Sequence, residues 1–121
     1  MEDAIAAVEC GATAIGFIFH SKSPRYISPE KAREIVIKIA GKVAFVGVFV
    51  DEPLDYVHTI SNVVGLDFIQ LHGNESSKYC DLIKLPVLKD YELACFLLLY
   101  NQIISFVKEN VIIKKANILI I

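Results

Sequence analysis

The sequence predicts an α/β fold in which helices alternate with parallel strands. Short apolar runs, too short for helices, recur along the chain and are separated by segments with the apolar spacing of helices. The runs are apolar on both faces, as expected for parallel strands covered on two sides. Runs and helical segments alternate at intervals of about 20–30 residues, which is typical of βαβ units.

The first unit covers the N-terminal third of the chain. Residues 1–11 are expected to form a helix that stops at Gly11, and residues 14–19 (AIGFIF) the first strand. A polar loop follows. Ser28 then offers an N-cap oxygen and Pro29 a favourable first helical residue, so a second, amphipathic helix is expected.

The pattern repeats twice in the middle of the chain. Residues 45–50 (FVGVFV) are expected to form the second strand, and a third helix opens at residues 51–53 and ends at Gly65. Residues 67–71 follow as a third strand. Asn74 is expected to cap the next helix.

The last third is less regular. Pro86 closes the fourth helix, residues 87–88 form a short strand, and residues 118–121 form a fifth. Between them, residues 93–110 are apolar nearly all round, which implies either a helix covered on several sides or a poorly specified segment.

Two closures of a parallel sheet fit this order: an open doubly wound sheet, or a (β/α)8 barrel, which typically has about 250 residues. The chain has 121 residues, so about half of a barrel would fit. An apolar final strand also favours a partial domain, because complete domains usually cover or blunt such an edge. Both closures stay open from these observations, and residues 1–121 are expected to form a single partial α/β domain.

Composition excludes several classes of function. With 12 Lys and Arg against 14 Asp and Glu, the net charge is −2, and no basic block is present that would bind nucleic acid. The most apolar stretch, residues 93–107, is shorter than a membrane span of about 20 residues. The N-terminus does not resemble a signal peptide, so the cytoplasm is the expected compartment.

Metal and disulfide chemistry is not indicated either. Cys10, Cys80 and Cys95 lie far apart without C-x-x-C spacing, and carboxylates and imidazoles do not cluster at ligand spacing. We expect reduced thiols and no metal site.

Candidate binding residues follow the predicted strands, because parallel α/β folds place their sites at the carboxyl ends of strands. Arg25, in the loop after the first strand, could grip a carboxylate through two parallel hydrogen bonds, although a solvated loop arginine is the more frequent case. Gln70 and His72 share one side of the third strand, and His72 could donate to a substrate oxygen or simply cap a carbonyl. His20 and His58 are expected to be structural.

Several motifs together resemble one family. Lys22–Pro29 (KSPRYISP), Val46–Val50 (VGVFV) and Gln70–Gly73 (QLHG), with their order and spacing, are similar to phosphoribosylanthranilate isomerases. The resemblance is clear over residues 1–89, while residues 90–121 diverge.

The resemblance implies that residues 1–121 form one incomplete (β/α)8 barrel domain, about half a barrel that begins with the first helix, of an enzyme of tryptophan biosynthesis. It implies an Amadori rearrangement of the phosphorylated substrate N-(5-phosphoribosyl)anthranilate by acid–base catalysis, without metal or organic cofactor. It also implies that Arg25 contacts the anthranilate carboxylate, and that Gln70 and His72 line the barrel mouth.

The family's two proton-transfer residues are expected to be missing. They are a cysteine in a C-G-x-T turn after the first strand and an aspartate that ends a later strand. Cys10-Gly11-Ala12-Thr13 fits the first string, but Cys10 ends a helix and precedes a strand, so we expect it to be a small buried helix residue at the opposite edge.

Three functional hypotheses follow. The chain is part of the isomerase and inactive alone, or a non-catalytic half-barrel, or a decayed remnant. The apolar fraction of 55% and the open sheet edges make self-association the expected behaviour of a half-barrel.

Overall fold

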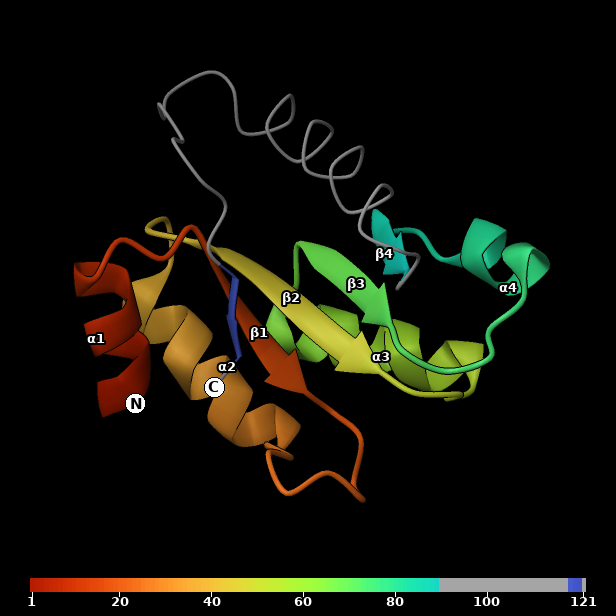
Figure 1. The fold of residues 1–121 in the computed structure, drawn as a ribbon, viewed down its shortest axis with the longest axis horizontal. Coiled ribbons are helices and arrows are strands. Elements are labelled where there is room, and N and C mark those ends of the chain that lie inside the picture. The colour runs from red at the N-terminus through yellow and green to blue at the C-terminus, as the bar shows by residue number, and fades with distance from the viewer. Residues whose placement is uncertain (90–117, 121) are drawn as a thin grey trace.

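The structure, a computed structural model, describes residues 1–89 and 118–120. Within these ranges helices and strands alternate as predicted (Figure 1). The apolar segment over residues 93–110, for which a covered helix or a poorly specified segment was expected, lies outside the described residues. The elements are α1 (Glu2–Glu9), β1 (Ala14–Ile18), α2 (Pro29–Ile39), β2 (Ala44–Phe49), α3 (Leu54–Val64), β3 (Phe68–Leu71), α4 (Ser77–Leu82), β4 (Val87–Lys89) and β5 (Ile118–Ile120).

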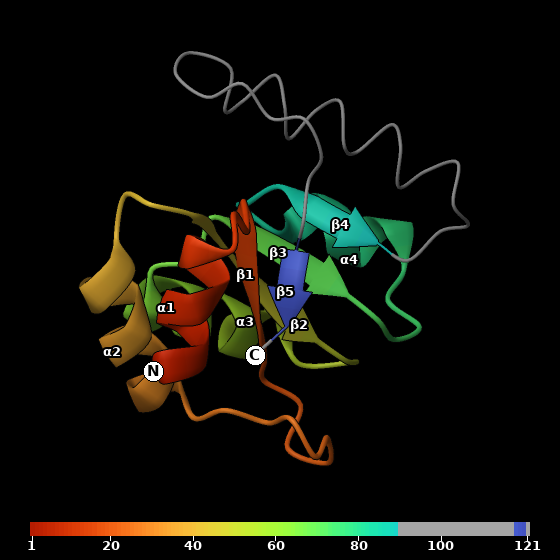
Figure 2. The same cartoon turned by 60° about the vertical axis from the view of Figure 1, so that its left-hand side comes forward.

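The strands form one parallel sheet in the order β4-β3-β2-β1-β5. Strands β1 to β4 are neighbours in chain order. In a barrel with its strands in chain order, the fifth strand would lie beside the fourth. Here β5 pairs instead with β1, with Ala14 opposite Ile118 (Figure 2). Both edges of the β1–β4 sheet offer unpaired backbone groups, and the long connections of parallel strands can reach either edge.

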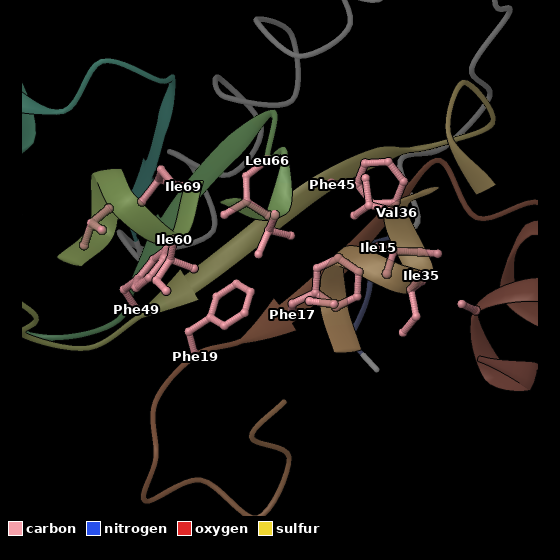
Figure 3. Packing of buried hydrophobic residues seen from close by; sticks show 14 of the residues in the cluster. Ile15, Phe17, Phe19, Ile35, Val36, Phe45, Phe49, Ile60, Leu66 and Ile69 are labelled. Atoms are coloured by element: carbon pink, nitrogen blue, oxygen red, sulfur yellow. The ribbon is translucent and has the colours of Figure 1, made fainter. Parts of the chain in front are cut away.

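The main core lies between the helices and one face of the sheet. Ile15 and Phe17 of β1 and Phe45 and Phe49 of β2 alternate onto this face, where they meet residues of α2 and α3 (Figure 3). Phe17 stacks on Phe45 with ring centroids 6.1 Å apart. Ala4 and Ala7 of α1 belong to the same cluster, and Tyr79 of α4 packs against it, so the described helices cover the same side of the sheet.

Gly47 leaves room for this aromatic packing. A methyl group there would overlap Leu66 and lie 2.9 Å from Phe49 and 3.4 Å from Phe19. The centre of β2 therefore tolerates only glycine without a shift of its neighbours.

The other face of the sheet has its own buried cluster. It consists of Ala14, Val46, Phe68 and Leu88, one from each of the strands β1 to β4. Burial on both faces agrees with the apolar runs from which parallel strands were predicted.

Two helix ends follow the sequence signals and one does not. Ser28 Oγ accepts a hydrogen bond from Lys31 N at 3.3 Å at the start of α2, and Gly65 ends α3 with a φ of +85°. The predicted cap Asn74 is wrong, because α4 is capped by Ser76, whose Oγ accepts from Tyr79 N at 3.1 Å. Asn74 and Glu75, in the loop before α4, instead form hydrogen bonds with Asp51 in the loop after β2.

Candidate functional site

The loops after β1, β2 and β3 lie at one edge of the sheet, because these strands are parallel and adjacent (Figure 1). We call this edge the C-terminal edge. It consists of the loops 19–28, 50–53 and 72–76. Parallel α/β folds place ligands at this edge.

Arg25 stands in a folded turn after β1. Its backbone N donates to Ser23 Oγ at 3.2 Å, and Tyr26 N donates to Ser23 O at 3.1 Å. Tyr26 also forms a bridge with Ile18, which returns the chain to the strand. The Arg25 side chain is exposed. An exposed guanidinium on an ordered turn is suited to grip a carboxylate through two parallel hydrogen bonds.

Gln70 and His72 occupy the end of β3. Gln70 is half-buried, lies opposite Val48, and shares the face of Phe68 by strand alternation. His72 is exposed, and its backbone N donates to Phe49 O at 3.0 Å. Strand β2 separates both from Arg25, so their strands are about 10 Å apart. The structure thus brings the three predicted residues to the same edge.

Asp51 and Glu75 are two residues of this edge that sequence reasoning missed. Glu75 Oε1 accepts from Asp51 N at 3.0 Å and from Gly73 N at 3.3 Å, and Asp51 Oδ1 accepts from Asn74 N at 2.7 Å. Glu75 is only 6% exposed. Its Oε2 has no hydrogen-bond partner among the described residues. The available signal was that each carboxylate follows a strand by a few residues.

Two tyrosines border the same loops. Tyr79 Oη donates to Glu52 O at 2.6 Å, and burial, followed by the nearby Glu75 and Glu52 carboxylates, raises the pKa of Tyr79 above 10.0. Burial also raises the pKa of Tyr56, with smaller contributions from Tyr26 and Glu52. Both phenols are therefore neutral near pH 7.

The residues predicted to be structural have separate outcomes. His58 Nε2 accepts from Lys84 N at 3.4 Å, which ties α3 to the loop before β4. His20 lies at the C-terminal edge, and its Nδ1 is buried without a partner in the part of the chain that the structure describes.

Cys10 follows α1 and precedes β1, as expected, and so lies away from the C-terminal edge. Its predicted burial is wrong, because it is exposed. The helix ends at Glu9, and Gly11, with a φ of +86°, turns the chain immediately after Cys10.

Over residues 1–89 and 118–120, no group of three or more His, Cys, Asp or Glu side chains is placed to hold a metal ion. No helix in these ranges has the length and apolarity needed to cross a membrane.

Comparison with known proteins identifies a family. The family model of N-(5'-phosphoribosyl)anthranilate (PRA) isomerase matches residues 1–112. The N-(5'-phosphoribosyl)anthranilate isomerase of Geobacter sp. (strain M21) is 50% identical over 91 residues, which are 75% of this chain and 45% of the relative. That of Thermotoga neapolitana is also 50% identical over 91 residues, 74% of this chain and 44% of the relative.

Solved structures agree. The crystal structure of phosphoribosyl anthranilate isomerase from Thermotoga maritima is 44% identical with a TM-score of 0.71, covering 73% of this chain and 44% of that one. A complex of such an isomerase with reduced 1-(o-carboxyphenylamino)-1-deoxyribulose 5-phosphate is 39% identical with a TM-score of 0.72, covering 84% and 55%.

This chain spans less than half the length of the curated relatives it matches. Its helices and parallel strands make up part of a (β/α)8 barrel. With the family model matched over nearly the whole sequence, the chain belongs to the N-(5'-phosphoribosyl)anthranilate isomerase family.

Proposed function

We propose that this chain provides part of an enzyme that isomerises N-(5-phosphoribosyl)anthranilate in tryptophan biosynthesis. The reaction is an Amadori rearrangement that yields 1-(2-carboxyphenylamino)-1-deoxyribulose 5-phosphate. The observation that carries the proposal is that family membership coincides with a C-terminal edge at which Arg25, Gln70 and His72 gather.

In this proposal Arg25 binds the anthranilate carboxylate. A guanidinium stays charged near neutral pH, so it can bind an anion but cannot transfer a proton. Its exposed position on an ordered turn supports this role. Gln70 and His72, one strand away from Arg25, line the same mouth and contact the same substrate.

The 121-residue chain by itself is proposed to be inactive. The family resemblance assigns proton transfer to a cysteine after the first strand and to an aspartate that ends a later strand. Cys10 precedes β1 instead of following a strand. Acid–base groups of this kind typically supply about 10²–10⁴-fold each.

An assay of substrate fluorescence tests the proposal. The chain alone should show at least about a hundredfold less turnover than a chain extended at both ends with the missing segments of the Geobacter sp. (strain M21) relative. The extended chain should isomerise the substrate. Turnover by the 121-residue chain, free of host isomerase, within about a hundredfold of the extended chain would contradict the assignment of roles.

A second candidate function is that of a non-catalytic half-barrel that associates with another copy of itself. The outer strands β4 and β5 are three residues long each, and each has its second edge unpaired in the described sheet. Such edges can pair with another chain. Light scattering should show association of the purified chain, and a dispersed monomer with cooperative unfolding would argue against it.

A further inference from the structure

We propose that the carboxylates of Glu75 and Asp51 form a reciprocal tie that positions His72 at the C-terminal edge. The proposal rests on the proposed function, in which His72 lines the substrate site. Glu75 and Asp51 act through the backbone and are positioning residues, with no contact to the reacting atoms.

The tie joins two loops that follow different strands. The side chain of Glu75, from the loop after β3, holds the backbone of Asp51 after β2, with 3.0 Å between Asp51 N and Glu75 Oε1. In return the side chain of Asp51 holds the backbone of Asn74, with 2.7 Å between Asn74 N and Asp51 Oδ1. Neither loop can change its conformation without breaking a contact of the other.

The backbone on both sides of His72 is held by this arrangement. His72 N donates to Phe49 O at 3.0 Å, which anchors it to the end of β2. The next amide, Gly73 N, donates to Glu75 Oε1 at 3.3 Å. The direction of the Cα–Cβ bond of His72 is therefore set from one side by β2 and from the other by Glu75.

Two local features agree with the tie. Asp51 has a φ of +49°, the only positive φ of a non-glycine residue in the ranges that the structure covers. Residue 73 is glycine, and a methyl group there would overlap the Asp51 carboxylate. An unusual backbone conformation of this kind persists only where its surroundings enforce it.

The burial of Glu75 argues that its position serves more than folding. A carboxylate that is 6% exposed and has one oxygen without a partner among the described residues is costly to bury. Glutamate is rarely buried in this way unless its contacts are needed.

Hydrogen exchange of the 121-residue chain, followed by mass spectrometry, tests the tie without using substrate. Amide exchange is measured at Asp51, His72, Gly73 and Asn74, with the amide of His58 in α3 as an internal reference. The variants are Glu75→Ala, Glu75→Gln and Asp51→Ala. Glu34→Ala, at an exposed position of α2, is the matched control.

In Glu75→Ala, amide exchange at Asp51 and Gly73 should accelerate about fivefold or more, and amide exchange at His72 about twofold or more. His58 should keep its rate. Glu75→Gln should restore much of the protection, because its Oε1 can still accept from both amides. Asp51→Ala should accelerate exchange at Asn74 and at His72 while Glu75 remains in place.

An unchanged His72 rate in both Glu75→Ala and Asp51→Ala would overturn the proposal. Equal acceleration at His72 and His58 would overturn it as well, since that pattern indicates general loosening. If Glu75→Ala unfolds the chain, Asp51→Ala decides between the same two outcomes. Because no substrate is involved, a failure here is separate from failure of the proposed isomerase activity.

Discussion

The two ends of the parallel sheet satisfy their polar groups in different ways. At the N-terminal ends of β2 and β3, Phe45 N donates to Asp67 Oδ2 and Asp67 N donates to Phe45 O, both at 2.8 Å. At the C-terminal edge, Glu75 Oε2 and His20 Nδ1 are buried without partners among the described residues. The positive φ of Asp51 lies at the same edge.

From this difference we infer that one sheet is divided into a stabilising end and a binding end. Unpaired buried polar atoms and unusual backbone angles cost free energy, and they gather where a ligand or a reaction requires them. At the N-terminal ends, Asp67 and Phe45 each accept a hydrogen bond from the backbone N of the other, so no such free-energy cost arises there. We therefore expect substitutions at one end to change stability and those at the other to change binding.

The largest effect on stability is expected at the centre of the sheet, which supports both ends. Gly47→Ala should lower the free energy of unfolding by about 2–3 kcal/mol, because the added methyl group overlaps Leu66 and crowds Phe49. Chemical denaturation measures the change. Gly41→Ala is the control. The added methyl group meets open space there, and only the strain of a φ of +79° should lower the free energy of unfolding, by about 1 kcal/mol. Equal costs at the two glycines would refute the packing argument.

At the N-terminal ends, Asp67→Ala should lower the free energy of unfolding by about 1–2 kcal/mol, because Phe45 N loses a charged acceptor. Asp81→Ala, at an exposed position of α4, serves as the control. Neither substitution should weaken substrate binding in the extended enzyme. Weaker binding without a loss of stability in Asp67→Ala would break the distinction between the two ends.

The smallest effect concerns alkaline pH. The pKa values of Tyr56 and Tyr79 are raised in the folded chain above the ordinary 10.0, so folding favours their neutral forms. Their contribution to stability is therefore complete below about pH 10 and is lost as the pH rises through the folded-state pKa values. Unfolding midpoints, measured from neutral to alkaline pH, should therefore begin to fall above about pH 10.

Tyr79→Phe sharpens this test. It should remove part of the alkaline loss and cost about 0.5–1.5 kcal/mol at pH 7, because the hydrogen bond to Glu52 O disappears. An unchanged alkaline profile in this variant would show that Tyr79 does not carry the effect.

Much of the fold could be predicted because local and tertiary preferences agree. Ser28 and Pro29 start α2, Gly65 stops α3, and the apolar runs form strands covered on both faces. The cap of α4 could not be predicted. Asn74 is as good a cap as Ser76 by sequence, but Asn74 and Glu75 are held in the loop that contacts Asp51, 23 residues before Asn74, so the helix begins only at Ser77. The pairing of β5 with β1 likewise depends on which edge of the finished sheet is available.

The site could be predicted only in part for a related reason. Arg25 and His72 follow strands and have side chains with evident binding chemistry. Glu75 also follows a strand, but its importance comes from its burial and from its contacts with the amides of two loops that meet only in the folded chain.

A comparison of two arginines tests the central claim most directly. Arg25 is exposed at the C-terminal edge, whereas Arg33 Nη1 donates to Val64 O at 3.3 Å near the N-terminal end of β3. Both are changed to alanine in the chain extended with the missing segments of the Geobacter sp. (strain M21) relative. Unfolding and substrate kinetics are then measured on the same preparations.

Arg25→Ala should raise KM by the equivalent of about 1.5–3 kcal/mol with little change in unfolding, and Arg25→Lys should recover only part of that loss. Arg33→Ala should lower the free energy of unfolding by about 1 kcal/mol and leave KM unchanged. A normal KM in Arg25→Ala, or a raised KM in Arg33→Ala, would contradict the division of the sheet into a binding end and a stabilising end.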